Sequence, residues 1–362
     1  MIDNLRNILP YVLKPLSLTY GFVTDLRNWM FDHNVLPSEE FDVPVISMGN
    51  ITVGGTGKTP HVEYVAGLLA SSYNIAILSR GYKRKTKGFL LANPTSTPDS
   101  IGDEPLQIYK KLGRRVKVAV CESRRKGIQE IMRQFPDTQL ILLDDSFQHR
   151  YVKPKVNILL MDYKRPIYED KLLPLGRLRE SSRNINRADM VIVTKCPVDL
   201  QPIDFRLVEK KLELMSFQKL YFSKVKYGAL TPVFPEDHPY HVELSSLSAK
   251  DTVMLVTGIA NPRDFIRHFK QYPFRVVISH FPDHHDFTRK DVEQIHNRFK
   301  SLKGERKIII TTEKDAIRLA YNPYFAASLK PYVFYIPITI NITQGLDEND
   351  FITDLLKDIE RT

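Results

Sequence analysis

A glycine-rich stretch near the start of the chain has the residue types of a phosphate-binding loop. It reads GNITVGGTGKTP over residues 49–60 and contains Lys58 followed by Thr59. In such a loop, glycines let backbone N–H groups approach a phosphate, the lysine reaches the β- and γ-phosphates, and the hydroxyl binds Mg²⁺. The apolar run VPVISMG before the loop and the helical spacing after it supply the strand and the helix that this chemistry requires.

The loop departs from the usual pattern at its first glycine. Thr52 stands in that place, and we expect Gly49, Gly54 and Gly55 to provide the turn from shifted positions. A glycine-rich turn with an accidental lysine is the plainer alternative. We predict that a nucleotide binds along the loop residues Thr52, Val53, Gly54, Gly55, Thr56, Gly57, Lys58 and Thr59.

Two acidic pairs occur in places where they could join the same site. The run LILLDD ends in Asp144 and Asp145, like strands whose carboxylates hold Mg²⁺ behind a phosphate-binding loop. In GDEPLQI, Asp103 and Glu104 begin a helix. The residues alone favour the plainer interpretation of this second pair, in which acidic side chains stabilise a helix N-terminus. The alternative is a base and a metal-binding carboxylate in the same cleft.

A histidine pair follows a predicted strand in the second half of the chain. In FPDHHDF, His284 and His285 lie between Asp283 and Asp286. This pattern suits either a metal site or an acid-base group tuned by a carboxylate. Because adjacent side chains at a strand end point to opposite sides, we expect one functional histidine rather than two ligands of one ion.

Basic clusters are concentrated in the half of the chain that carries the loop. Residues 80–187 contain 24 Lys and Arg against 12 Asp and Glu, an excess of 12, whereas the whole chain has a net charge of +10. The clusters SRGYKRKTKG, CESRRKG and LLPLGRLRES follow or lie near predicted strand ends, where ligands of open α/β sheets bind. They predict an anionic partner, such as a nucleotide, a phosphorylated substrate, an anionic lipid or nucleic acid, with a solvated basic surface as the alternative.

The first thirty residues carry many apolar side chains but are interrupted by Pro10, Lys14 and Pro15. The apolar run is shorter than the roughly 20 residues that span a bilayer, and no cleavage site of a secretory signal follows it. Two interpretations stay open, a helix in a membrane interface and a helix packed on the protein's own surface. The two cysteines, Cys121 and Cys196, imply no disulfide framework and suit a reducing cytoplasm.

The elements that must position these residues alternate between short apolar strands and helices. Runs between residues 43 and 195 are apolar on both faces, with helical spacing between them. This alternation predicts an α/β fold of the P-loop NTPase type, with a doubly wound, mainly parallel sheet and a second, smaller α/β domain. The predicted divisions are an amphipathic membrane-associating segment over 1–35, a nucleotide- and substrate-binding domain over 36–218, a linker over 219–250, and the smaller domain that closes the cleft over 251–362.

Together these motifs resemble those of the tetraacyldisaccharide 4'-kinases, the lipid A kinases of Gram-negative bacteria. The resemblance rests on VISMGNITVGGTGKTP, SRGYKRKTKG, GDEPLQI, LLDDSFQHR, LLPLGRLRES, VTKC, TGIANPRDF, FPDHHDF and TTEKDAIRL, in the family's order over about residues 43–319. It implies transfer of the γ-phosphate of ATP to the 4'-hydroxyl of tetraacyldisaccharide 1-phosphate, which forms the 4'-phosphate of the lipid A precursor (lipid IVA). It also implies peripheral contact with an anionic membrane at the cytoplasmic face of the inner membrane.

The resemblance implies roles for single residues as well. Lys58 and Thr59 would bind phosphate and Mg²⁺, and Asp103 would take the proton of the sugar hydroxyl, with His284 orienting it from across the cleft. The other implied site residues are the carboxylates of the metal environment, Glu104, Asp144 and Asp145, and the substrate-facing Tyr82, Arg124 and Arg179.

Two residues depart from the family's motifs, and two rival classes stay open. Ser146 stands where glycine is usual after the acidic pair, and Arg177 stands where proline is common, which puts the turn and the loop that carries Arg179 in question. The rivals are a P-loop GTPase-like switch or metallochaperone, and a nucleic-acid-binding ATPase. The chain lacks the Asp of a guanine-reading loop after VTK, and its basic clusters are not interleaved with aromatic residues as stacking platforms. We therefore predict no nucleic-acid partner and no obligatory protein partner.

Overall fold

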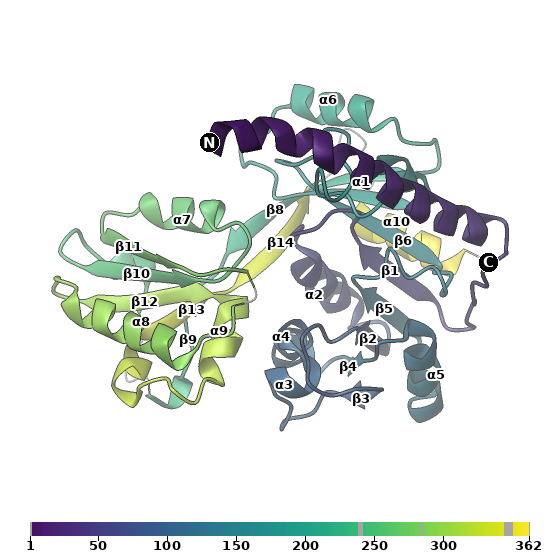
Figure 1. Ribbon diagram of the computed structural model, residues 1–362. Helices are drawn as coiled ribbons and strands as arrows, with labels where there is room; N and C mark the ends of the chain where they lie inside the picture. Colours follow the sequence, from purple (N-terminus) through teal and green to yellow (C-terminus); the bar gives the residue numbers. More distant parts are fainter. Residues whose placement is uncertain (1, 238–241, 284, 344–349, 362) are drawn as a thin grey trace.

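The computed structural model describes residues 2–237, 242–283, 285–343 and 350–361, which form two α/β domains (Figure 1). Within these ranges, the larger domain contains a nine-stranded sheet in the order β14-β8-β7-β6-β1-β5-β2-β4-β3. Its inner strands are parallel, and β14 and β3 pair antiparallel at the two edges. The strands are β1 (Val45–Gly49), β2 (Ile75–Ser79), β3 (Leu90–Leu91), β4 (Lys117–Val120), β5 (Leu140–Asp144), β6 (Val156–Asp162), β7 (Met190–Thr194), β8 (Lys219–Tyr227) and β14 (Ile338–Thr343).

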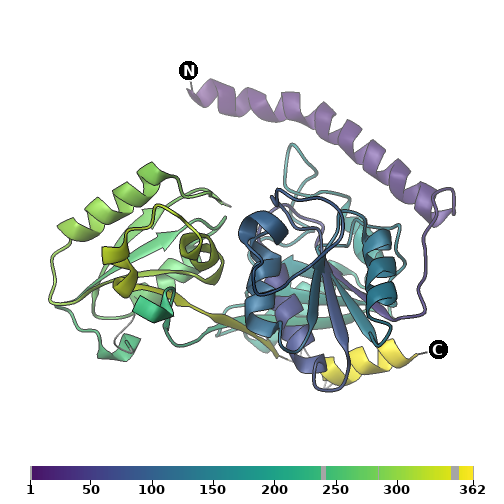
Figure 2. The same ribbon diagram turned by 90° about the horizontal axis from the view of Figure 1, so that it is seen from below.

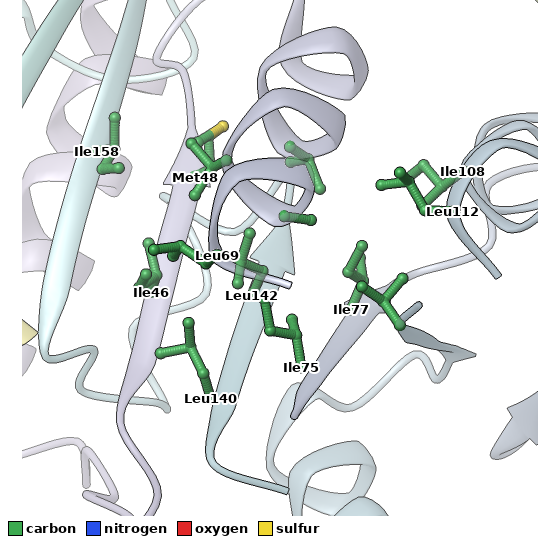
Figure 3. Close-up of a cluster of buried hydrophobic side chains, with 14 of the residues drawn as sticks. Ile46, Met48, Leu69, Ile75, Ile77, Ile108, Leu112, Leu140, Leu142 and Ile158 are labelled. Carbon is green, nitrogen blue, oxygen red and sulfur yellow. The ribbon is translucent and has the colours of Figure 1, made fainter. Parts of the chain in front are cut away.

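Helices cover both faces of this sheet. They are α1 (Ile2–Asp32), α2 (Lys58–Leu69), α3 (Pro98–Ile101), α4 (Asp103–Leu112), α5 (Arg124–Gln134), α6 (Pro202–Leu212) and α10 (Phe351–Glu360), with a 3-10 helix at Ser182–Arg187. Every residue of β1, β2, β5 and β7 is buried, as the two-sided apolar pattern predicted. Figure 3 shows strand side chains packed against side chains of α2 and α4. The strands contribute Ile46, Met48, Ile75, Ile77, Leu140 and Leu142, and the helices contribute Leu69, Ile108 and Leu112.

The smaller domain has a second sheet, in the order β11-β10-β12-β13-β9. Its strands are β9 (Thr231–Pro232), β10 (Thr252–Thr257), β11 (Arg275–His280), β12 (Lys307–Thr312) and β13 (Val333–Ile336). Its helices are α7 (Arg263–Lys270), α8 (Arg289–Ser301) and α9 (Glu313–Ala320), with short 3-10 helices at Pro235–Asp237, Leu244–Ser246 and Ala327–Tyr332. The predicted α/β class, with a larger and a smaller domain, is confirmed.

The predicted domain boundaries are wrong at β8, β14 and α10. Residues 219–227 are not a linker, because β8 pairs with β7 inside the larger sheet. The chain returns from the smaller domain as β14, which pairs antiparallel with β8, and α10 then packs its apolar side on the core of the larger domain. Phe222 and Thr343 come together although they are 121 positions apart, and such pairing leaves no local signal in the sequence. Figure 1 shows β8 and β14 side by side between the domains.

Helix α1 lies along the outside of the larger domain, with its N-terminal end projecting from the fold (Figure 2). One side of the helix is attached to the larger domain by hydrogen bonds. Ser17 Oγ donates to the Leu172 carbonyl at 2.9 Å, and the Tyr20 hydroxyl donates to the Arg179 carbonyl at 2.8 Å. Packing on the protein's own surface is therefore part of the fold. The rest of the helix exposes the apolar side chains Tyr11, Leu16, Leu18, Phe22, Val23, Leu26 and Trp29. Among the helices of the described ranges, none is long and apolar enough to cross a membrane.

Candidate active site

The glycine-rich loop leaves β1 and leads into the first turn of α2, as predicted. Two backbone hydrogen bonds, of 2.8 and 2.7 Å, pair residues 51–53 with residues 177–179. The chain therefore stays extended at Thr52 and turns later, at Gly54 (φ 110°) and Gly57 (φ 86°). Side-chain-bearing residues rarely adopt such angles, whereas glycine does so at little cost. The missing first glycine is explained, because no turn is made at position 52.

Two residues that the sequence reasoning missed hold carbonyl groups of the loop. Thr194 Oγ1 donates to the carbonyl of Thr56 at 2.9 Å. Lys195 Nζ donates to the carbonyl of Gly55 and lies 2.9 Å from Asp162 Oδ2. Both residues stand at the carboxyl end of β7, two strands from β1 in the sheet. Their occurrence in VTKC, directly after a buried strand, was the signal that could have revealed them.

Asp144 and Asp145 end β5 beside the loop and differ in their surroundings. Asp144 is buried, and burial, then repulsion from Glu104 and from Asp145, raises the pKa of its carboxyl to about 7. Burial also acts on Asp145, but Lys58 and Arg179 outweigh it and hold the pKa of that carboxyl below its usual range. Their nitrogen atoms lie 3.6 and 3.4 Å from Asp145 Oδ1. The carboxyl of Asp144 therefore gains or loses its proton near neutral pH, whereas that of Asp145 stays ionised.

Of the predicted substrate-facing residues, Arg124 and Arg179 are partly engaged inside the protein. Arg124 is 3% exposed, and its guanidinium donates to the carbonyls of Cys121 (3.0 Å) and Asp144 (2.8 Å). Arg124 therefore supports the end of β5 as well as lining the cleft. Tyr82 is 60% exposed, as expected for a side chain that meets a substrate. Their roles toward a substrate stay predictions.

The acidic pair at the start of α4 is contacted by two cations of α9. Arg318 Nε lies 2.7 Å from Asp103 Oδ2, and a second guanidinium nitrogen contacts the same oxygen. One turn earlier, Lys314 Nζ lies 3.4 Å from Glu104 Oε1 and 3.6 Å from Asp283 Oδ1. The pair therefore does more than stabilise a helix N-terminus, because it joins the larger domain to the smaller one.

The histidine pair is only partly described. His284 lies outside the residues that the structure describes, so its predicted role stays a prediction. His285 stacks on Phe281 with ring centroids 5.1 Å apart, and its Nε2 lies 2.9 Å from Asp291 Oδ2. This pairing places His285 at the N-terminus of α8, inside the smaller domain. The expectation of one functional histidine rather than two ligands of one ion stays a prediction, since His284 lies outside the described residues.

A cleft of about 1320 Å³ collects most of the predicted residues and is lined by both domains. Tyr20, Thr24 and Arg27 of α1 form part of its wall. Thr52 is buried and Asp103 contacts Arg318, and neither residue is among those that line the cleft. The predicted residues that line the cleft are Val53, Gly54, Gly55, Thr56, Gly57, Lys58, Thr59, Tyr82, Glu104, Arg124, Asp144, Asp145 and Arg179.

The donor set beside the loop fits a magnesium nucleotide rather than a closed metal cage. Across the described ranges, no group of three or more His, Cys, Asp or Glu side chains could hold a metal ion. Mg²⁺ in nucleotide sites keeps several waters and takes one or two carboxylates together with the substrate's phosphates. The Thr59 hydroxyl, Asp144 and Asp145 form such a partial set. Asp144 Oδ1 is buried and, among the described residues, has no hydrogen-bond partner.

Comparisons with known proteins agree with this geometry. The family profile described as Tetraacyldisaccharide-1-P 4'-kinase matches residues 9–360. A tetraacyldisaccharide 4'-kinase of Bacteroides thetaiotaomicron is 49% identical over 340 residues, covering 92% of this chain and 89% of the relative. One of Phocaeicola vulgatus is 47% identical over 349 residues, covering 95% and 94%. A crystal structure of LpxK from Aquifex aeolicus in complex with ATP matches with a TM-score of 0.73 and 29% identity, covering 97% of this chain and 99% of that chain.

The strand β1 in the middle of a mainly parallel sheet, with the glycine loop and helix that follow its carboxyl end, defines a P-loop nucleotide-binding enzyme. The match over nearly the whole length then shows that this chain belongs to the tetraacyldisaccharide 4'-kinase family. The predictions of this family and of an ATP-dependent kinase are confirmed, and the ATP-bound relative supports ATP as the nucleotide. None of these comparisons supports a GTPase-like switch or a metallochaperone.

Proposed function

We propose that this chain transfers the γ-phosphate of ATP to the 4'-hydroxyl of tetraacyldisaccharide 1-phosphate and so forms lipid IVA. The observation that carries the proposal is that one cleft joins the P-loop to α1. It is lined by Lys58 and by the acidic residues Glu104, Asp144 and Asp145, and its wall includes a helix whose outer side is apolar and exposed. A sugar headgroup in the cleft with acyl chains along α1 satisfies both surfaces at once.

The chemistry is an in-line displacement at phosphorus. The carboxylate of Asp103 takes the proton of the 4'-hydroxyl while the hydroxyl oxygen forms a bond to the γ-phosphorus. At the same time the bond from that phosphorus to the bridging oxygen of ADP breaks. Lys58 and the N–H groups of the loop stabilise the charge on the phosphate oxygens. Bound Mg²⁺, held by Thr59, Asp144 and Asp145 with Glu104 nearby, would neutralise further phosphate charge. Arg318 of the smaller domain contacts Asp103 and would hold its carboxylate in place, a role that we expect His284 to share. Closure of the domains would exclude water from the site.

The transfer itself is the first test. Purified protein in detergent, with ATP, Mg²⁺ and tetraacyldisaccharide 1-phosphate, is expected to move labelled γ-phosphate into the lipid and to release little of it to water. The same lipid with its 4'-hydroxyl blocked is the matched control acceptor. Label that appears only as inorganic phosphate would sink the proposal, because the chain would then be a nucleotide hydrolase.

Binding of Mg²⁺ is expected to compete with a proton at Asp144. Burial and the neighbouring acidic groups raise the pKa of this carboxyl to about 7. An Asp carboxyl in the unfolded chain ionises at a pKa of about 4, so the free energy of unfolding falls as the pH rises from about 4 to about 7. A bound cation offsets that loss of stability. Mg²⁺ with a non-hydrolysable ATP analogue should therefore raise Tm more at about pH 8 than at about pH 6. Asp144→Asn should lose most of this pH dependence, whereas equal shifts of the wild type at both pH values would contradict the assignment.

We further propose that the protein works as a peripheral protein at the cytoplasmic face of the inner membrane, held by α1. Leu18 and Phe22 are 66% and 68% exposed and lie one turn apart. Replacing both with serine should weaken binding to vesicles that contain anionic lipid by about tenfold or more, since each buried apolar side chain stabilises binding by roughly 1.5–3 kcal/mol. Vesicle co-sedimentation measures this change.

The control for this prediction is Tyr324→Ser in the smaller domain, since Tyr324 is 55% exposed but far from α1 in the sequence. It is expected to leave vesicle binding unchanged. If the α1 variant binds vesicles as the wild type does, α1 is not the membrane anchor, even where kinase activity persists.

A further inference from the structure

Side chains hold three consecutive carbonyl groups of the P-loop. The carbonyl of Gly55 accepts a hydrogen bond from Lys195 Nζ, and that of Thr56 accepts one from Thr194 Oγ1. The third, that of Gly57, accepts from Nδ1 of His61 at 2.7 Å and from the backbone N–H of the same residue at 3.2 Å. His61 follows the motif GKTP directly, in the first turn of α2, and is not used in the chemistry proposed above.

Fixing the carbonyl of Gly57 also fixes a donor for phosphate. The carbonyl of Gly57 and the N–H of Lys58 belong to one planar trans peptide group and point in opposite directions. The carbonyl is directed toward His61 along α2, so the N–H of Lys58 is directed away from the helix, at its N-terminus. Donors in that place bind phosphate oxygens. Gly57 has φ 86°. Because glycine adopts several backbone conformations of similar energy, a contact from outside the residue is needed to select this one.

The ring of His61 has a defined tautomer. A carbonyl oxygen can only accept, so Nδ1 carries the proton and Nε2 accepts from the hydroxyl of Ser223, at 2.8 Å. His61 is 1% and Ser223 0% exposed. Burial lowers the pKa of His61 to about 4, so the imidazole is neutral near neutral pH. In a protonated imidazole both ring nitrogens are donors, so Nε2 could no longer accept the hydrogen bond of the Ser223 hydroxyl.

Ser223 connects this contact to the strands between the domains. It lies in β8, where it is paired with Ile342 of β14, and its own carbonyl accepts from the N–H of Cys196 at 3.0 Å. The hydroxyl is therefore held in place by a fully paired strand. His61 stands between that strand and the P-loop, and each of its ring nitrogens is used.

We propose that His61 is a positioning residue of the ATP site, which holds the peptide group between Gly57 and Lys58 through a relay from Ser223. The inference rests on the proposed function only in its use of ATP. It assigns to His61 an effect on nucleotide binding and none on the lipid acceptor.

Nucleotide affinity without lipid is the direct test. His61→Phe keeps a ring but removes both hydrogen bonds, and it is expected to weaken binding of Mg·ATP by about three- to tenfold, the equivalent of a lost hydrogen bond. KM for ATP should rise by a similar factor, with KM for the lipid unchanged. His61→Asn places an amide donor near the Nδ1 position and should recover part of the affinity. Ser223→Ala leaves Nδ1 in place and should give a smaller loss.

The matched control is Val62→Ala, since Val62 is the next residue of α2 and is fully buried. It removes packing but no contact to the loop, and it should lower Tm without changing the affinity for ATP. Wild-type affinity in folded His61→Phe would overturn the proposal, and so would a loss in Val62→Ala as large as that in His61→Phe. Failure of the kinase proposal would look different, because wild-type protein would then bind ATP but transfer nothing to lipid.

Discussion

Replacing Lys58 with alanine is expected to lower kcat for phosphate transfer to the lipid by about 10²- to 10³-fold. Lys58 is the first residue of α2 and lines the cleft, with its Nζ 3.6 Å from Asp145 Oδ1. From there its ammonium group can reach the phosphate oxygens on which charge develops during transfer. An interaction made mainly in the transition state lowers kcat and kcat/KM together. Initial rates at saturating ATP and lipid measure the change.

The control for this variant is Lys290→Ala, which removes an exposed lysine from α8 in the smaller domain. It should leave kcat unchanged. Because Lys58 also balances Asp145, the Tm of Lys58→Ala has to be compared with that of the wild type before the rates are interpreted. A folded Lys58→Ala enzyme that keeps more than about a tenth of the wild-type kcat would be incompatible with this role.

The second large effect is expected at Asp103. Asp103→Asn keeps the shape of the side chain but removes its ability to take a proton, and kcat should fall by about 10²- to 10⁴-fold. The affinity for ATP, measured without lipid, should stay close to that of the wild type, because Asp103 has no proposed contact with the nucleotide. Asp99→Asn, at the start of the neighbouring helix α3, is the matched control and should keep full activity.

A companion variant separates the base from its ion pair. Asp103→Asn also removes the negative charge that the largely buried Arg318 contacts across the domains, and loss of one partner from a buried ion pair is destabilising. Arg318→Gln removes the same ion pair but leaves the carboxylate of Asp103 in place. It should therefore retain clearly more activity than Asp103→Asn. If the two variants lose activity equally, with equal losses of Tm, the effect at Asp103 comes from the interface between the domains and not from proton transfer.

Features carried by contiguous residues could be predicted from the sequence. The P-loop, the acidic end of β5 and the two-sided strands each depend on local pattern and on burial, which the residue types express directly. The placing of Lys58, Thr59 and Asp145 in one cleft followed from the rule that carboxyl ends of parallel strands meet at one edge of the sheet. The sequence also predicted that the turn of the loop is shifted away from Thr52, and in the structure the turn occurs later, at Gly54.

Features that depend on distant pairings could not be predicted in this way. The return of β14 and α10 to the larger domain is set by pairing with β8, and nothing local marks it. The contact between Arg318 and Asp103 joins residues 215 positions apart, and its charges alone would suit many other partners. Thr194 and Lys195 were overlooked because a hydroxyl and an amine after a strand have many uses, and only the fold brings them to the loop.

The position of the transferred phosphate on the lipid is the decisive evidence for the proposed kinase activity. Protein, ATP labelled at the γ-phosphate, Mg²⁺ and tetraacyldisaccharide 1-phosphate are incubated, and the lipid product is examined by ³¹P NMR and by fragmentation in mass spectrometry. We expect one new phosphomonoester on the 4'-oxygen, with the 1-phosphate intact, and loss of this product in Lys58→Ala and Asp103→Asn. A lipid that stays unphosphorylated while ATP is consumed, or that gains its phosphate at another position, would contradict this expectation.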